Sequence, residues 1–315
     1  MSAFTSAFVG ALEEGDLAAI RACPKADLHT HGYLSANRAF VKARTGRDIA
    51  PLARPIASMD EMHAWVDAHV RPLFDGGDGR LLGFEAAFAQ AIADGLTRIE
   101  LGDDVWAITR GMGTAAELHR SLDRLHRATA PDVEWIAQAS MSRHCSIAAL
   151  DRWLSPFLET GLYRTLDLSG NELAQPIERF VPLYRKAKAA GLRLKAHVGE
   201  WGTADDVRRA IELLELDEVQ HGIAAADDPG VMRFIADHRI RLNICPTSNV
   251  MLGRVESLDK HPIRALVDAG VIVTVNTDDV LVFGNGVSEE FLALYRCGLF
   301  TAAELDDIRR NGLAQ

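Results

Sequence analysis

Cysteines are few and scattered in this chain. Only four occur among its 315 residues, and they are Cys23, Cys145, Cys245 and Cys297. The sequence contains neither a CxxC pair nor a dense disulfide framework. It therefore predicts a reduced chain in the cytoplasm.

Basic charge is also in short supply. Lys and Arg total 34 residues against 44 for Asp and Glu, which gives a net charge of -10. Binding to a nucleic-acid backbone requires clustered Lys and Arg. The composition therefore argues against a nucleic-acid partner.

Long apolar runs are missing as well. No stretch approaches the ~20 consecutive apolar residues that span a bilayer, which argues against a membrane partner. The N-terminal stretch MSAFTSAFVGALEEGDL has no basic segment ahead of its apolar residues. It predicts a short amphipathic helix and not a signal peptide.

What the chain does contain is a recurring order of helical pattern, glycine and strand-like run. A glycine at this place takes the left-handed position that ends a helix. The four such glycines are Gly95, Gly161, Gly191 and Gly270. Helix starts carry capping-box patterns, which are Ser58-x-x-Glu61, Thr203-x-x-Asp206 and Thr301-x-x-Glu304.

Eight strand-like segments alternate with the helical patterns. They are residues 26–31, 96–101, 133–140, 163–169, 192–198, 217–221, 240–245 and 271–277. This alternation predicts an α/β fold, a (β/α)8 TIM barrel forming one domain over residues 1–315. An open doubly wound sheet is the alternative. The segment 32–94 is too long for a simple βα unit, so we expect a helical cap over one end of the barrel.

Four of these segments end in residues that bind metals or transfer protons. The residues are His29 and His31 on the first, His197 and Glu200 on the fifth, His221 on the sixth, and Asp278 and Asp279 on the eighth. One such ending is easily chance, but four predict a shared site. Three imidazoles and a carboxylate suit one zinc ion with room for a bound water.

Each motif alone also has an ordinary explanation. The two histidines could be polar residues at a strand end, and Glu200 could cap a helix. A single histidine such as His221 is usually structural, and an Asp-Asp pair is common in solvated turns. The fourth strand does not end in Lys, so we expect no modified lysine that would bridge a second metal.

Residues after the second and third strands are candidates for the wall of the site. Asp103, Asp104 and Trp106 follow the second strand, and Trp106 offers a flat wall for a ring. Arg143 and His144 follow the third strand. They could line a pocket, or the arginine could support a loop.

Six sequence blocks point to a known family. They are KADLHTH, LDLSGNE, AHVGE, QHG, CPTSN, and NTDD with VFG shortly after. In these blocks and their order the sequence resembles the adenosine deaminase family of the amidohydrolase superfamily. The resemblance implies a (β/α)8 barrel with one zinc ion per chain. It also implies hydrolytic removal of the 6-amino group of an adenine-type ring, with release of ammonia.

The resemblance assigns roles to single residues. Glu200 would protonate the ring nitrogen beside the attacked carbon, and His221 would orient and deprotonate the attacking water. Asp279 and the backbone N–H of Gly170 would hydrogen-bond nitrogens on the imidazole and pyrimidine sides of the purine. The zinc ligands would be His29, His31, His197 and Asp278.

The part of the site that meets the ring substituent departs from the family pattern. The family's nucleoside enzymes carry Asp-Gly after the second metal histidine, whereas this chain has Gly32-Tyr33 after His31. In the family that Asp contacts the ribose. We therefore expect His31 and Tyr33 to border an aminopurine or nucleoside substrate that lacks the ordinary ribose contact.

Two other interpretations remain open at this point. One is a different mononuclear-zinc hydrolase that cleaves another C–N bond, and the other is a non-catalytic metal-binding barrel. Glu200 argues against the second, because a protein that only binds has no need of a proton donor. The sequence predicts no oligomeric state.

Overall fold

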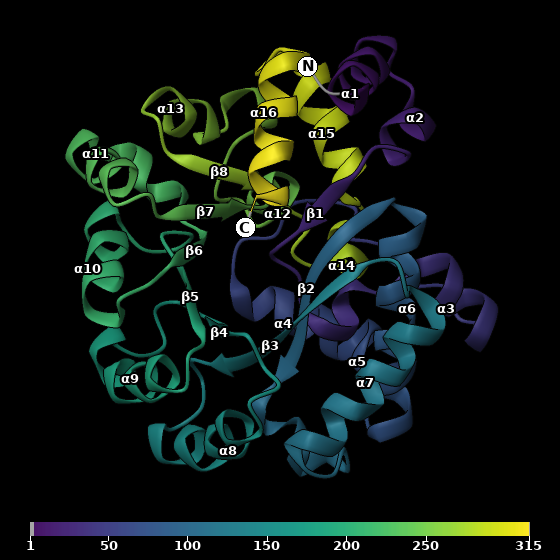
Figure 1. The fold of residues 1–315 in the computed structure, drawn as a ribbon, viewed down its shortest axis with the longest axis vertical. Coiled ribbons are helices and arrows are strands. Elements are labelled where there is room, and N and C mark those ends of the chain that lie inside the picture. The colour runs from purple at the N-terminus through teal and green to yellow at the C-terminus, as the bar shows by residue number, and fades with distance from the viewer. Residues whose placement is uncertain (1–2, 315) are drawn as a thin grey trace.

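Eight parallel β-strands form the centre of the computed structural model, which describes residues 3–314 (Figure 1). The strands neighbour one another in chain order, so the predicted (β/α)8 barrel is confirmed. Their bounds are β1 (Lys25–Asp27), β2 (Leu96–Asp104), β3 (Glu134–Ser142), β4 (Thr165–Ser169), β5 (Arg193–Val198), β6 (Glu218–His221), β7 (Arg241–Ile244) and β8 (Ile272–Val275).

The barrel closes where the residues after β8 meet those after β1. Thr30 and Asp278 form an isolated parallel bridge there, and the Asp278 N–H donates to the His29 carbonyl at 2.9 Å. β1 ends at Asp27, earlier than the predicted segment 26–31. His29 and His31 therefore lie just beyond the strand.

Helices surround the sheet and cover its outer face with apolar side chains. Those that follow the strands around the barrel are α7 (Ala115–Thr129), α8 (Ile147–Thr160), α9 (Val181–Ala189), α10 (Ala204–Leu214), α11 (Pro229–Asp237), α12 (Pro246–Met251), α13 (Ile263–Asp268) and α16 (Ala302–Leu313). The 3-10 helices in the loops are η2 (Val105–Arg110), η3 (Ile177–Phe180), η4 (Ile223–Asp227) and η5 (Leu258–Lys260).

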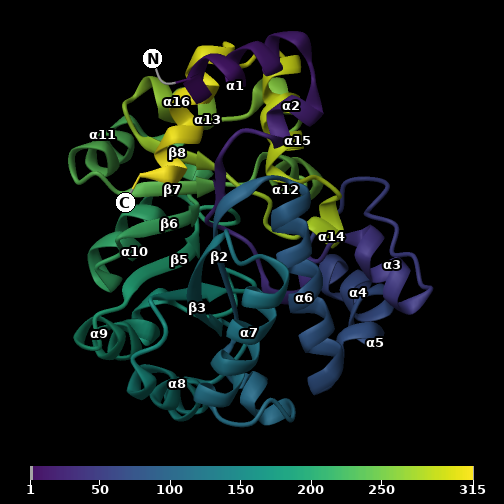
Figure 2. The ribbon, with the colours of Figure 1, turned by 45° about the vertical axis from the view of Figure 1, so that its right-hand side comes forward.

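The N-terminal segment forms the predicted helix, α1 (Ala3–Glu14). With α2 (Leu17–Arg21) and α15 (Val287–Arg296) it packs beside α16 at one end of the barrel (Figures 1 and 2). None of the helices within residues 3–314 is both long and apolar enough to cross a membrane.

The long connection between β1 and β2 is helical. Its elements are η1 (Gly32–Ser35), α3 (Arg38–Thr45), α4 (Met59–His69), α5 (Arg71–Phe74) and α6 (Gly77–Ala93). α6 packs against α7 and β2. The shorter helices gather on one side of the molecule near α14 (Val280–Phe283) (Figure 2) and share a second apolar core.

Helix starts follow the predicted capping patterns in two of three cases. The pairs at Thr203 and Thr301 form complete capping boxes. Ser58 accepts from the Glu61 N–H, but the Glu61 carboxylate reaches Ala57 N–H instead of that of Ser58. α4 is therefore capped by one half of the motif.

The inner face of the barrel holds a buried charged cluster that we call the Lys195 cluster: Glu100, Lys195 and Glu218. Lys195 Nζ donates to Glu100 Oε2 at 2.5 Å and lies 3.0 Å from Glu218 Oε2. All three side chains are almost fully buried. Barrel interiors are usually filled by branched apolar residues. Here an ion cluster fills part of that space, two residues before His197 on the same face of β5.

Candidate active site

The loops at the carboxyl ends of the strands enclose a cavity of about 410 Å³, a size typical of small-molecule sites. α4 covers it with Met59, Met62 and His63. The predicted site residues that line the cavity are His31, Tyr33, Trp106, Gly170, His197, Glu200, His221, Asp278 and Asp279. His29 is fully buried and reaches the same cluster from beneath.

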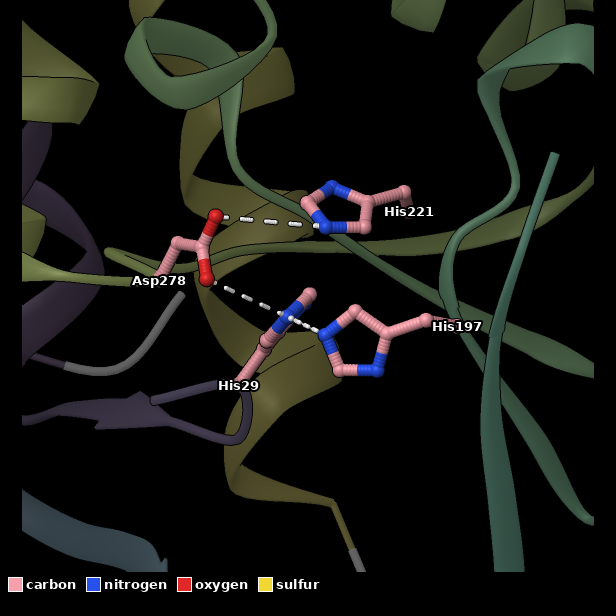
Figure 3. Close-up of side chains that lie close together, drawn as sticks. All are labelled: His29, His197, His221 and Asp278. Carbon is pink, nitrogen blue, oxygen red and sulfur yellow. Dashed lines mark hydrogen bonds and ion pairs between the residues drawn. The ribbon is translucent and has the colours of Figure 1, made fainter. Parts of the chain in front are cut away.

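Figure 3 shows the imidazoles of His29, His197 and His221 close to the Asp278 carboxylate, and His31 lies beside this group. His197 Nε2 lies 3.0 Å from His29 Nε2 and 3.2 Å from His31 Nε2. Asp278 Oδ1 lies 3.0 Å from His31 Nε2 and 3.7 Å from His29 Nε2. Ligand atoms bound tetrahedrally to one zinc ion are about 3.3 Å apart. These four distances are close to that value, so they are compatible with one ion held by the predicted ligand set.

The Nδ1 atoms of His29 and His197 already have hydrogen-bond partners. His29 Nδ1–H donates to the Asn243 carbonyl at 2.9 Å. His197 Nδ1–H donates to Asp167 Oδ1 at 3.3 Å. These bonds assign the free lone pairs to Nε2. Burial, with the neighbouring imidazoles, lowers the pKa of His29 well below its usual value, so the ring is neutral as a metal ligand must be.

The close approach of these nitrogens tests whether a metal fits. Two neutral imidazoles whose lone pairs face each other at 3.0 Å repel unless a proton or a cation lies between them. A third nitrogen, from His31, and the Asp278 carboxylate point at the same place. One divalent cation satisfies all four groups, so the residues fit the predicted ion.

Backbone geometry aims two of the site residues. His221 and Asp278 have φ of 63° and 62°, a left-handed conformation that is uncommon outside glycine and clusters at functional sites. The eighth strand is predicted over residues 271–277, directly before Asp278 and Asp279. The strand ends earlier, at Val275, and the left-handed turn directs Asp278 into the cluster, where Ser248 Oγ donates to it at 2.6 Å.

A chain of hydrogen bonds assigns the tautomer of His221. The Ile263 N–H donates to His261 Nδ1 at 3.1 Å, so His261 Nε2–H donates to Asn249 Oδ1 at 3.2 Å. The Asn249 amide then faces His221 and donates to its Nδ1 at 3.1 Å. Burial lowers the pKa of His221 to about 3. The neutral ring therefore carries its hydrogen on Nε2, 3.5 Å from Glu200 Oε1.

This tautomer distinguishes His221 from the metal ligands. Its Nε2 lies near the cluster, 3.9 Å from Asp278 Oδ2, and His29, His197, His221 and Asp278 together have the compactness of a metal site. A protonated Nε2 cannot ligate a metal, however. The network therefore favours His31 over His221 as the third imidazole.

We expect Asn249→Leu to lower kcat by about 10–100-fold while the zinc content stays unchanged. The substitution removes the donor that holds His221 in this tautomer, and losses of that size are usual for partners of site residues. Steady-state kinetics and metal analysis of the purified variant measure both quantities. Loss of zinc would show instead that His221 is a ligand.

One carboxylate fastens the loop that carries Glu200. Glu172 Oε1 accepts from the Gly199 N–H at 2.7 Å. Its Oε2 accepts from the next three backbone N–H groups at 2.9–3.1 Å, those of Glu200, Trp201 and Gly202. Gly199 has a φ of 72° and makes a tight turn directly before Glu200.

Arg143 supports the same region from below. Its guanidinium donates to the Glu172 carbonyl at 2.7 Å and to the His197 carbonyl at 2.9 Å. Arg143 is buried, whereas His144 lines the cavity. Of the two alternatives for this pair, the arginine supports a loop and the histidine forms part of the wall.

Glu200 and Asp279 face the cavity as buried acids, and one oxygen of each has no hydrogen-bond partner in the described part of the chain. Glu200 Oε1 and Asp279 Oδ1 accept no hydrogen bond from any residue in 3–314. Burial and the nearby Asp278 charge raise the pKa of both carboxyls well above the usual range. Both groups can therefore hold a proton and donate it toward a ligand in the cavity.

Comparison with known proteins decides the family. The sequence model of adenosine deaminases matches residues 77–315. The chain belongs to the adenosine deaminase family. It is 38% identical over 281 residues to the "Putative adenosine/adenine deaminase" of Treponema pallidum, covering 89% of this chain and 94% of that protein. It is 32% identical to an adenine deaminase of Rhodopseudomonas palustris, covering 93% of this chain and 89% of that one.

Solved structures share the barrel of this adenosine deaminase family member. Adenine deaminase from Arthrobacter aurescens superposes with a TM-score of 0.78 at 24% identity, covering 92% of each chain. The complex of ADAL with IMP gives 0.78 at 18% identity, covering 94% of this chain and 92% of that one. The enzyme is thus a hydrolase of C–N bonds with the fold of these deaminases.

Sequence reasoning missed several residues that shape this deaminase site. Asp167 orients His197, Glu172 holds the Glu200 loop, and Asn249 orients His221. All three lie in blocks that carry the family resemblance, LDLSGNE and CPTSN, so a signal was present. Met62 and His63 lie on α4, inside the predicted cap segment 32–94, but no local pattern identified them as residues that line the cavity.

Proposed function

We propose that this enzyme removes the 6-amino group of an adenine-type ring by hydrolysis, with release of ammonia and one zinc ion per chain. The observation that carries the proposal is a pair of buried acids on the cavity wall, Glu200 and Asp279, each with one oxygen that accepts no hydrogen bond from residues 3–314. A purine ring offers nitrogens on both its edges. Two protonated carboxyls facing one cavity suit such a ring.

The residues that would hold zinc are the predicted ligands His29, His31, His197 and Asp278, which contact one another at 3.0–3.7 Å in four pairs. A zinc ion bound there would activate the attacking water as a Lewis acid. His221 would orient that water through its Nε2–H. In the assigned tautomer the neutral ring cannot take the proton, so orientation is the part of its predicted role that this geometry supports.

Glu200 would supply the proton that the reaction needs. Attack at C6 removes the conjugation of the ring, so the adjacent nitrogen must be protonated at the same time. A carboxyl with a raised pKa does this near neutral pH. Asp279 would donate to a nitrogen on the imidazole side, and the Gly170 N–H would meet the pyrimidine side.

Tyr33 marks the part of the site where the substrate differs from that of the family's nucleoside enzymes. Its ring packs against Phe74 with centroids 5.4 Å apart and under the Arg80 guanidinium at 5.1 Å. No carboxylate is offered from this position. We infer that the substrate is an aminopurine or nucleoside that does not use the ordinary ribose contact.

An ammonia-release screen of adenine, adenosine and 5′-modified nucleosides on zinc-loaded enzyme tests the function. Mass spectrometry of the products separates deamination, which keeps the ring, from opening of a ring. For adenosine we expect kcat/KM below ~10⁶ M⁻¹s⁻¹. A value at or above that level would refute the inference from Tyr33.

Removal of metal by chelation should abolish ammonia release, and Zn²⁺ should restore it. The predicted ligands converge on one place, so we expect metal analysis to give one zinc ion per chain. His197→Ala should purify without bound zinc and without activity. An active, metal-free wild-type enzyme would contradict the assigned cluster.

A further inference from the structure

The second strand ends in two aspartates with different surroundings, Asp103 and Asp104. Both line the cavity. Asp103 is buried and fully engaged: Arg80 Nε donates to its Oδ2 at 2.9 Å, and Arg80 Nη2 to its Oδ1. The Asp104 N–H also donates to Asp103, at 2.9 Å. Asp103 therefore has a structural partner for each oxygen.

Asp104 has no such partner. It occupies the N-cap of η2, where an Asp side chain ordinarily accepts from the following N–H groups, yet it makes no side-chain cap bond. The nearby donors, the Asp104 N–H and Arg80, bind Asp103 instead, and no donor within residues 3–314 hydrogen-bonds the Asp104 carboxylate. This half-buried acceptor at the cavity wall is free for a ligand.

We propose that Asp104 is a specificity-determining residue that accepts a hydrogen bond from a donor on the substituent of the purine ring. This inference rests on the proposed deamination. Tyr33 provides no carboxylate at the position the family uses for that contact, and Asp104 supplies one from a different strand. The enzyme then acts on purines that carry a hydroxyl- or amino-bearing substituent.

Two arginines beside the cavity, Arg71 and Arg80, are paired with carboxylates. Arg71 lies 3.0 Å from Asp67 Oδ1. Arg80 pairs with Asp103 and stacks over the Trp106 ring at 4.7 Å. A substituent that carries a phosphate would meet paired arginines and the free Asp104 carboxylate. The wall therefore favours a neutral donor over an anion.

The two histidines that line this side of the cavity, His63 and His144, do not add a positive charge that would favour an anionic substituent. The Asn171 N–H donates to His144 Nε2 at 3.2 Å, which makes that nitrogen an acceptor in a neutral ring. Burial lowers the pKa of His63, which packs edge-on against His144 with centroids 5.3 Å apart. Neither ring offers a fixed cation to a phosphate.

The test compares adenine, adenosine and AMP on zinc-loaded wild type, Asp104→Ala and Asp104→Asn. Wild type should prefer adenosine to adenine and should use AMP poorly. Measured above the pKa of about 7 to which burial raises Asp104, Asp104→Ala should lower kcat/KM for adenosine by about 10–100-fold, the range for a lost hydrogen bond to a charged group. It should leave kcat/KM for adenine within about twofold, which also shows that the variant is folded. Asp104→Asn keeps one acceptor and should fall between the two.

Asp60→Ala, which removes an exposed carboxylate at the start of α4, is the matched control and should leave the adenosine-to-adenine ratio unchanged. An equal loss for adenine and adenosine in both Asp104 variants would overturn the proposal, as would a wild type that prefers AMP. A wild type that deaminates adenine and adenosine equally well refutes only the role of Asp104. A wild type that releases ammonia from no purine refutes the proposed function itself.

Discussion

Glu200→Gln is expected to lower kcat for deamination by about 10²–10⁴-fold, the contribution typical of a positioned general acid. Glutamine has nearly the same shape and can still donate a hydrogen bond, but it cannot release a proton to the ring. Because the missing interaction belongs to the transition state, KM should change little. Steady-state kinetics on zinc-loaded protein measures both constants.

The pH dependence of kcat gives the same prediction a second readout. Burial, with the charge of Asp278, raises the pKa of Glu200 well above its usual value. The proton-bearing form is therefore present below that raised pKa and is lost as the pH rises through it. The kcat of the wild type should therefore decrease at alkaline pH. The residual kcat of Glu200→Gln should not show this decrease.

Glu212→Gln is the matched control for this substitution. Glu212 lies on the exposed face of α10, paired with Arg208. Its replacement should leave kcat and the pH profile unchanged. If Glu200→Gln behaved like the control, the proton donor would have to be another group.

Lys195→Met is expected to lower the free energy of unfolding by about 3–5 kcal/mol, the usual result of breaking a buried ion pair from one side. Without the ammonium, Glu100 and Glu218 would remain buried in the barrel beside each other. Burial opposes ionisation of Glu218, but Lys195 and Arg241 outweigh it and hold its pKa below the usual range. Urea unfolding followed by circular dichroism measures the change.

Lys188→Met makes the same substitution where the charge is exposed. Lys188 pairs with Glu215 on the surface, with both side chains 53% exposed. Such pairs contribute only about 0–1 kcal/mol, so the control should unfold near the wild-type midpoint. A double variant Lys195→Met/Glu100→Gln should lose less than the sum of its parts, because the pair interacts. Strict additivity would contradict the assigned contact.

The strands could be predicted because local signals are strong. A glycine such as Gly95 both ends a helix and avoids a collision, since a Cβ there would lie 1.7 Å from the Arg21 carbonyl. The apolar runs after such glycines became β2, β4, β5 and β8. The convergence of the four proposed ligands follows from parallel strands that share one mouth.

Other features depend on partners far away in the sequence. Lys195 lies in an apolar run, and only the folded barrel brings Glu100 and Glu218 to it. The left-handed turn at Asp278 depends on its bridge to Thr30. No local pattern encodes such contacts, so the ends of β1 and β8 were predicted too late in the chain.

The hydrogen bonds of Glu172 join two loops into one mechanical unit. Glu172 follows Gly170 by two residues, and its carboxylate holds the loop that presents Glu200. Any displacement of the segment after β4 would carry the proton donor with it. Redesign of substrate preference at that edge would therefore disturb proton delivery, whereas α4 and the end of β2 can be varied without moving Glu200.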